Sequence, residues 1–68
     1  MFQLIVNGEN QTFSTPIISI KELLNRLNIA EQGRIIELNN KIIKKENLSK
    51  VTLKNLDSIE IIQFMGGG

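Results

Sequence analysis

One stretch of helical periodicity, beginning at Ser19, constrains the fold of this 68-residue chain more than any other feature. Ser19-Ile20-Lys21-Glu22 fits a capping box, in which the serine hydroxyl accepts a helix N–H and the glutamate reaches back to the cap. Apolar residues then recur at helical spacing and form one stripe, which consists of Ile20, Leu23, Leu24 and Leu27. A run of about nine residues is too short to be a stable helix in water. We therefore expect it to pack on a sheet formed by the rest of the chain.

The segment before this helix predicts a β-hairpin. Residues 1–6 alternate between apolar and polar, which is typical of a half-buried strand. Asn7-Gly8 follows, and this pair favours a type I′ turn because both central residues of such a turn need positive φ. Residues 9–14 then form the return strand, which closes at Thr15-Pro16 because proline cannot donate to a strand ladder.

Residues 34–39, after the helix, predict a third strand. Because Glu37 should point outward, parity assigns faces to the apolar residues of this strand: Ile36 and Leu38 inside, Ile35 outside. Asn39-Asn40-Lys41 predicts a turn, since asparagine tolerates left-handed backbone angles. Ile42-Ile43 begins a short fourth strand.

The segment between residues 44 and 57 is polar and mixed. We expect Leu48, Val51 and Leu53 to anchor it to the core, with residues 51–53 as a short strand or turn. A turn at residues 55–57 leads into the last strand. The first and last strands have the strongest alternation, so both should lie centrally, side by side and parallel. The fold class is therefore α+β, a mixed sheet of four or five strands packed on one main helix.

Composition excludes several classes of function. The chain has no cysteine and no histidine, which leaves no thiolate nucleophile and argues against a metal site. A net charge of +1 with interspersed signs argues against nucleic acid as a partner. No apolar run approaches the roughly 20 residues of a membrane span, and no secretory signal is visible. We expect a protein of the cytoplasm, or of an organelle of bacterial descent such as the plastid stroma.

The last strand runs without a linker into Gly66-Gly67-Gly68. Glycines have few steric limits, so a narrow channel in a partner enzyme can close around them and reach the Gly68 carboxylate. We expect a domain of residues 1–65 and a flexible tail of residues 66–68. A frayed terminus or a cloning remnant is the alternative.

The parity of the last strand predicts a docking patch beside this tail. If Ile59 and Ile61 point to the helix, Ile62 and Phe64 point outward, and exposed apolar groups mark partner sites. Met65 and Ile35 are the other expected members. The alternatives are that a loop or a dimer partner covers these side chains, or that strand twist places Phe64 in the core.

This arrangement resembles the sulfur carriers of the ubiquitin-like β-grasp family, and the ThiS-like carriers of thiamin biosynthesis in particular. The resemblance covers the whole chain and lies in five segments: Asn7-Gly8, residues 19–24, Glu37-Leu38-Asn39, Ile42-Ile43, and residues 57–61 ahead of Gly67-Gly68. Leu56 departs from the family pattern, which commonly has glycine before the aspartate.

The resemblance implies a protein co-substrate rather than an enzyme, with no bound cofactor and no metal. A ThiF-like adenylating enzyme would consume ATP, with magnesium, to join the Gly68 carboxylate to AMP. A cysteine desulfurase or other sulfur donor would supply sulfur for a thiocarboxylate, and a ThiG-like thiazole synthase would receive it. The chain would be a monomer when free. Three alternatives stay open: the small subunit of molybdopterin synthase, a ubiquitin-like interaction module that is not a carrier, and a structural domain with a remnant tail.

Overall fold

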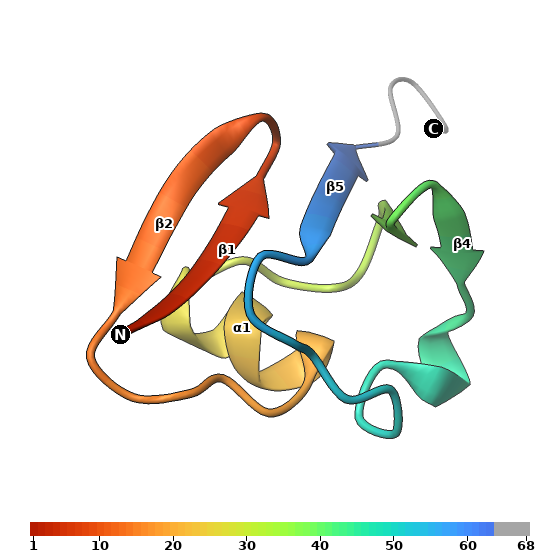
Figure 1. Cartoon of the computed structure of the whole chain (residues 1–68). Helices are drawn as coiled ribbons and strands as arrows, with labels where there is room; N and C mark the ends of the chain where they lie inside the picture. The colour runs from red at the N-terminus through yellow and green to blue at the C-terminus, as the bar shows by residue number, and fades with distance from the viewer. Residues whose placement is uncertain (64–68) are drawn as a thin grey trace.

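The computed structural model describes residues 1–63, which form one mixed sheet and one α-helix (Figure 1). The elements in chain order are β1 (Phe2–Val6), β2 (Glu9–Phe13), α1 (Ile20–Arg26), β3 (Arg34–Leu38), β4 (Lys41–Ile43), the 3₁₀ turn η1 (Lys45–Asn47) and β5 (Ser58–Gln63). The strand order is β2-β1-β5-β3-β4. β1 and β5 are parallel, and the other neighbouring pairs are antiparallel. The prediction that the first and last strands lie side by side and parallel is confirmed.

Both hairpin turns use the left-handed backbone that their asparagines predict. Asn7 and Gly8, between β1 and β2, have φ of 50° and 82°. Asn39 and Asn40, between β3 and β4, have φ of 50° and 71°. Positive φ at both central residues gives a type I′ turn, whose twist matches that of the flanking strands.

α1 begins at the predicted cap and is shorter than the predicted run of about nine residues. The Ser19 hydroxyl accepts the Glu22 N–H at 3.2 Å, whereas the Glu22 carboxylate accepts the N–H of Ile18, at 2.8 Å, rather than that of Ser19. At the other end Asn28 has φ of 59°. The N–H groups of Asn28 and Ile29 donate to the carbonyls of Asn25 and Leu24, respectively, as in a Schellman motif. The helix therefore has 7 residues.

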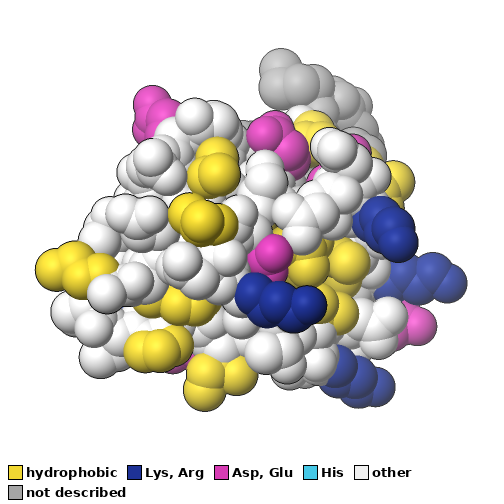
Figure 2. All heavy atoms as spheres, in the orientation of Figure 1, with side chains coloured by type: hydrophobic (Ala, Val, Ile, Leu, Met, Phe, Trp, Pro, Cys, Tyr) yellow, Lys and Arg dark blue, Asp and Glu magenta, His cyan; other side chains and the backbone are white. Residues whose placement is uncertain are grey.

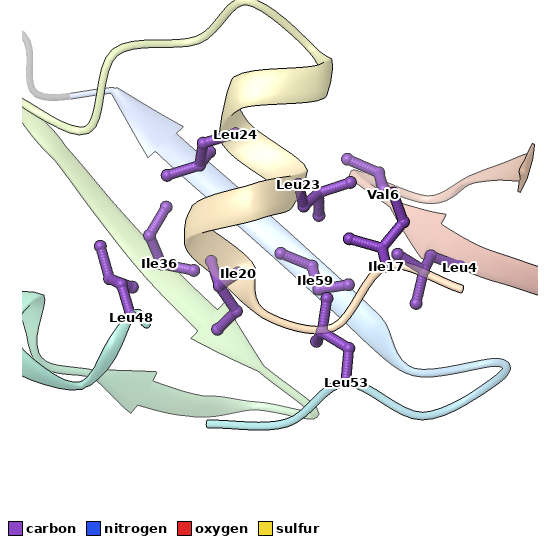
Figure 3. Close-up of a cluster of buried hydrophobic side chains, with 10 residues drawn as sticks. All are labelled: Leu4, Val6, Ile17, Ile20, Leu23, Leu24, Ile36, Leu48, Leu53 and Ile59. Atoms are coloured by element: carbon purple, nitrogen blue, oxygen red, sulfur yellow. The ribbon is translucent and has the colours of Figure 1, made fainter. Parts of the chain in front are cut away.

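The buried side chains lie between α1 and one face of the sheet (Figure 3). The most deeply buried are Leu4, Ile17, Ile20, Leu23, Leu48 and Ile59. These residues come from β1, α1, β5 and two connecting segments, the one before α1 and the one before β5. The helix is therefore packed against the sheet and against both connecting segments. Leu27, the last member of the predicted stripe, is only half-buried at the edge of this core. The opposite face of the sheet has no helix over it within the described residues (Figure 1).

Truncation of the helix stripe tests this arrangement. Leu24 is 2% exposed, so Leu24→Ala leaves a cavity and should reduce the free energy of unfolding by about 2–5 kcal/mol. Ile18→Ala is the matched control, because Ile18 is 65% exposed and should change stability by no more than about 0.5 kcal/mol. Urea denaturation of both variants gives the comparison. Equal stability of the Leu24→Ala variant and the wild type would contradict the assignment of the core.

The segment from β4 to β5 differs from prediction. η1 was not expected, and residues 51–53 form no strand; Thr52 makes one isolated bridge with Ser19. The expected anchoring is nevertheless present, since Leu48 and Leu53 are 1% and 5% exposed and Val51 is half-buried. Their backbones attach to the start of α1: the Lys21 N–H donates to the Leu48 carbonyl and the Leu53 N–H to the Ile18 carbonyl.

Leu56, the departure from the family pattern, has φ of 71°. A left-handed backbone costs an L-residue about 1–2 kcal/mol, and glycine escapes this cost. Glycine also gives the unfolded chain more freedom, which offsets roughly 0.4–1 kcal/mol of the gain. We expect Leu56→Gly to raise the free energy of unfolding by up to about 1 kcal/mol and Leu56→Ala, which keeps the Cβ, to leave it unchanged. Thermal melts of the two variants test this, and a lower melting temperature for Leu56→Gly would contradict it.

Candidate docking surface at the end of β5

The side chains at the end of β5 alternate between the two faces of the sheet in the order that the sequence predicts. Ile59 is fully buried, and Ile61 packs against the core as a half-buried side chain. Ile62 points to the other face and is 41% exposed, and Gln63 is exposed. Ile62 lies directly opposite Ile35 of β3, so the structure brings together these two members of the predicted patch.

The same sheet face has two features that sequence reasoning missed. Glu60 lies directly opposite Glu37, and Ile42 of β4 lies opposite Glu37 on its other side. Ile42 is 66% exposed. Like charges facing each other across a strand pair are destabilising. Ile43 of β4 packs against the core, and neighbouring residues of a strand point to opposite faces. This alternation is the signal that could have placed Ile42 on the outer face. We call Ile35, Ile62, Ile42, Glu37 and Glu60 the outer-face patch.

Polar side chains fix the start of β5. Asp57 accepts the Asn39 amide at 3.0 Å and the Lys54 N–H at 2.7 Å. The side-chain oxygen of Asn39, Oδ1, in turn accepts the Ser58 N–H at 3.0 Å. A second asparagine, Asn7, accepts the Ile61 N–H at 2.7 Å with its side-chain oxygen. Sequence reasoning assigned Asn7 and Asn39 to turns and missed these bonds to β5.

Two hollows of the described surface are lined by no residue of β5. One, of about 280 Å³, is lined by Leu24, Asn25, Asn28, Ile29 and Ala30. The other, of about 250 Å³, is lined by Met1, Phe2, Ser14, Pro16 and Asn55. Neither lining includes an ionisable side chain, so neither offers a side-chain acid or base. Within residues 1–63 no three acidic, histidine or cysteine side chains gather as a metal site.

The charged side chains are unevenly distributed over the surface. Five of the eight basic residues lie between the start of β4 and the turn before β5: Lys41, Lys44, Lys45, Lys50 and Lys54. Figure 2 shows basic side chains gathered on the side of the molecule where β4 and η1 lie. No helix among the described residues is long and apolar enough to cross a membrane.

The remaining predicted site residues lie outside the described part of the chain. These are Phe64, Met65, Gly66, Gly67 and Gly68. Their roles stay predictions, and so does the docking role of Ile35 and Ile62, whose positions alone are established.

A five-stranded mixed sheet packed on one helix, with the last strand central and parallel to the first, is the architecture of the ubiquitin-like β-grasp class. The crystal structure of the thiamine biosynthesis protein ThiS from Geobacter metallireducens superposes with a TM-score of 0.85 at 33% identity, over 98% of this chain and 100% of that one. The model of the ThiS family matches residues 3–68. The chain belongs to the ThiS family of sulfur carriers.

Three curated relatives match most of this chain. The sulfur carrier protein ThiS of Bacillus subtilis is 35% identical over 96% of this chain and 98% of its own length. A thiazole synthase of Paramagnetospirillum magneticum is 32% identical over 97% of this chain, which spans only 20% of that longer protein. The uncharacterized protein ycf40 of Trieres chinensis is 35% identical over 93% of this chain and 85% of its own length.

Proposed function

We propose that this chain carries sulfur to thiazole formation in thiamin biosynthesis, as a co-substrate whose Gly68 carboxylate becomes a thiocarboxylate. The family match, which extends through Gly68, is the observation that carries the proposal. The names of two relatives, a ThiS sulfur carrier and a thiazole synthase, support the pathway. The place of action would be the cytoplasm or a plastid stroma.

The chemistry requires activation because a carboxylate is a poor electrophile. A ThiF-like enzyme joins the Gly68 carboxylate to AMP from ATP, with magnesium, and releases pyrophosphate. A persulfide from a cysteine desulfurase or other sulfur donor then attacks the acyl carbon and displaces AMP. Reduction of the resulting acyl disulfide by a thiol leaves the thiocarboxylate, whose sulfur is nucleophilic at neutral pH. The catalytic groups belong to the partners, and this chain supplies the acyl group.

The outer-face patch would bind the adenylating enzyme. Ile62 ends the described part of β5 together with Gln63, so a surface bound there also holds the start of the segment that leads to Gly68. Phe64 and Met65 would extend this contact. Glycines at 66 and 67 would let a channel wall close around the backbone.

Incubation with a ThiF-like enzyme, ATP and a sulfur donor tests the proposal. Intact-mass spectrometry should show the replacement of one oxygen by sulfur in this chain. A second assay offers the thiocarboxylated chain either to a ThiG-like thiazole synthase or to the large subunit of molybdopterin synthase, and sulfur transfer only with the latter would support the alternative pathway. A mass increase that corresponds to covalent attachment to another protein would instead support a ubiquitin-like modifier, and an unchanged mass would contradict the carrier function.

A further inference from the structure

β5 continues beyond the point where its neighbour β1 ends. The parallel register pairs Ile5 with Ser58 and Val6 with Ile59, and the β1 backbone then turns away at Asn7-Gly8. On its other side β5 stays paired with β3 to Gln63, opposite Arg34. The last described residues of β5 therefore have backbone support from a strand on one side only.

Asn7 supplies the missing support on the other side. Its backbone N–H donates to the Ile59 carbonyl at 2.8 Å, and its side-chain oxygen accepts the Ile61 N–H at 2.7 Å. One residue thus bonds β5 at two successive positions of the same edge. The side-chain oxygen replaces the carbonyl that a further residue of β1 would have provided.

The turn itself does not require this side chain. Asn7 has φ of 50°, a conformation that glycine adopts without strain, and Gly-Gly also favours a type I′ turn. The amide of Asn7 therefore contributes something beyond turn formation, namely the bond to Ile61.

A second asparagine makes the equivalent contact at the opposite end of β5. Asn39, also at φ of 50°, donates its N–H to the Ser58 carbonyl at 2.8 Å and accepts the Ser58 N–H at 3.0 Å. The two turns thus fix β5 by similar bonds, one where the strand begins and one three residues further on, toward residue 64. Asn39 is a natural control for Asn7, because its bonds hold the same strand at the end remote from the tail.

We propose that Asn7 is a positioning residue for the C-terminal segment: through its bond to Ile61 it fixes the direction in which β5 leads to Gly68. This inference rests on the proposed carrier function. A fixed strand end keeps the population ready for the adenylating enzyme high, and a lower population raises the apparent KM by the same factor without changing the turnover at saturation. Asn7 acts through β5 and takes no part in the chemistry.

Three variants test this role: Asn7→Gly, Asn7→Asp and Asn39→Gly. Asn7→Gly keeps the turn and removes the side-chain oxygen that accepts the Ile61 N–H. Asn7→Asp keeps both the turn and an acceptor oxygen, because Asp-Gly also favours a type I′ turn. The third removes the side-chain bonds at the remote end of β5. ATP–pyrophosphate exchange by a ThiF-like enzyme, measured against carrier concentration, gives KM and kcat. Hydrogen exchange at the Ile61 amide, followed by NMR, reports the bond directly.

For Asn7→Gly we expect exchange at Ile61 to accelerate roughly fivefold, the factor that one neutral hydrogen bond contributes. The carrier KM should rise about two- to fivefold with kcat unchanged. Asn7→Asp should have the wild-type rate of hydrogen exchange at Ile61 and the wild-type KM. Asn39→Gly should lower the melting temperature at least as much as Asn7→Gly and leave the KM at the wild-type value.

An unchanged KM for Asn7→Gly, or an equal rise in KM for Asn39→Gly, would overturn the positioning role. ATP–pyrophosphate exchange with the wild-type chain would still support the carrier function in that case. Absence of ATP–pyrophosphate exchange with the wild-type chain would overturn the carrier function, and the role of Asn7 with it.

Discussion

A chain that ends at Gly67 should give no ATP–pyrophosphate exchange with the adenylating enzyme, and it should melt at the same temperature as the full chain. Removal of Gly68 moves the carboxylate back by about 3.5 Å, the reach of one extended residue. A misplacement of about 1 Å can already cost a hundredfold in rate, so the loss should be complete within detection. The fold should not change, because the buried core residues of the described part of the chain, residues 1–63, lie between Leu4 and Ile59.

A full-length chain with Gly68 as a C-terminal amide is the matched control for this truncation. It keeps the length and replaces the charged oxygen by an uncharged NH2 group, so it should also give no exchange. Exchange at the wild-type rate from either variant would contradict the carrier function. A lowered melting temperature for the truncated chain would show that the tail also supports the fold.

Ile62→Glu should weaken binding to the adenylating enzyme by at least about a hundredfold with little change in stability. A partner that covers the outer-face patch would have to desolvate the new carboxylate, which costs several kcal/mol when no counter-charge is present. Ile62 is 41% exposed, so in the free chain the carboxylate stays in water. The loss of β-propensity, the loss of contact with Ile35 and repulsion from Glu60 should together cost about 1 kcal/mol.

Thr12→Glu is the control for the added charge. Thr12 is exposed in β2, at the edge of the sheet remote from β3, and pairs with Gln3. This variant has the same net charge as Ile62→Glu and should bind the enzyme normally. Calorimetric titration and thermal melts of both variants decide the question. Equal affinity of Ile62→Glu and the wild type would contradict the docking role of the patch, and equal weakening by Thr12→Glu would indicate a general charge effect.

Most of the fold could be predicted from the sequence because local signals and the global fold agree. The Ser19 cap, the asparagines of the two turns and the parity of β5 each act over a few residues, and each is found as predicted. The segment around Val51 could not be assigned because it has no periodicity; its shape is set by Leu48 and Leu53, which attach to α1 from far along the chain.

The candidate site was predicted less completely, for a different reason. Parity could place Ile62 and Ile35 on the outer face, but it could not show that Glu60 meets Glu37, because that contact depends on the register between β3 and β5. The bond from Asn7 to Ile61 joins residues 54 positions apart and depends on where β1 ends. Such contacts follow from three-dimensional pairing and leave no local pattern in the sequence.

The central position of β5 has a consequence for synthesis. Until residues 58–63 leave the ribosome, β1 and β3 have no common neighbour, so the two hairpins of a nascent chain cannot join into one sheet. Pairing of β1 with β5 also closes a loop of more than fifty residues, a non-local contact of the kind that slows folding. A chain that stops before β5 would expose two strand edges and be prone to aggregation or degradation. Premature termination before β5 should therefore yield no folded domain.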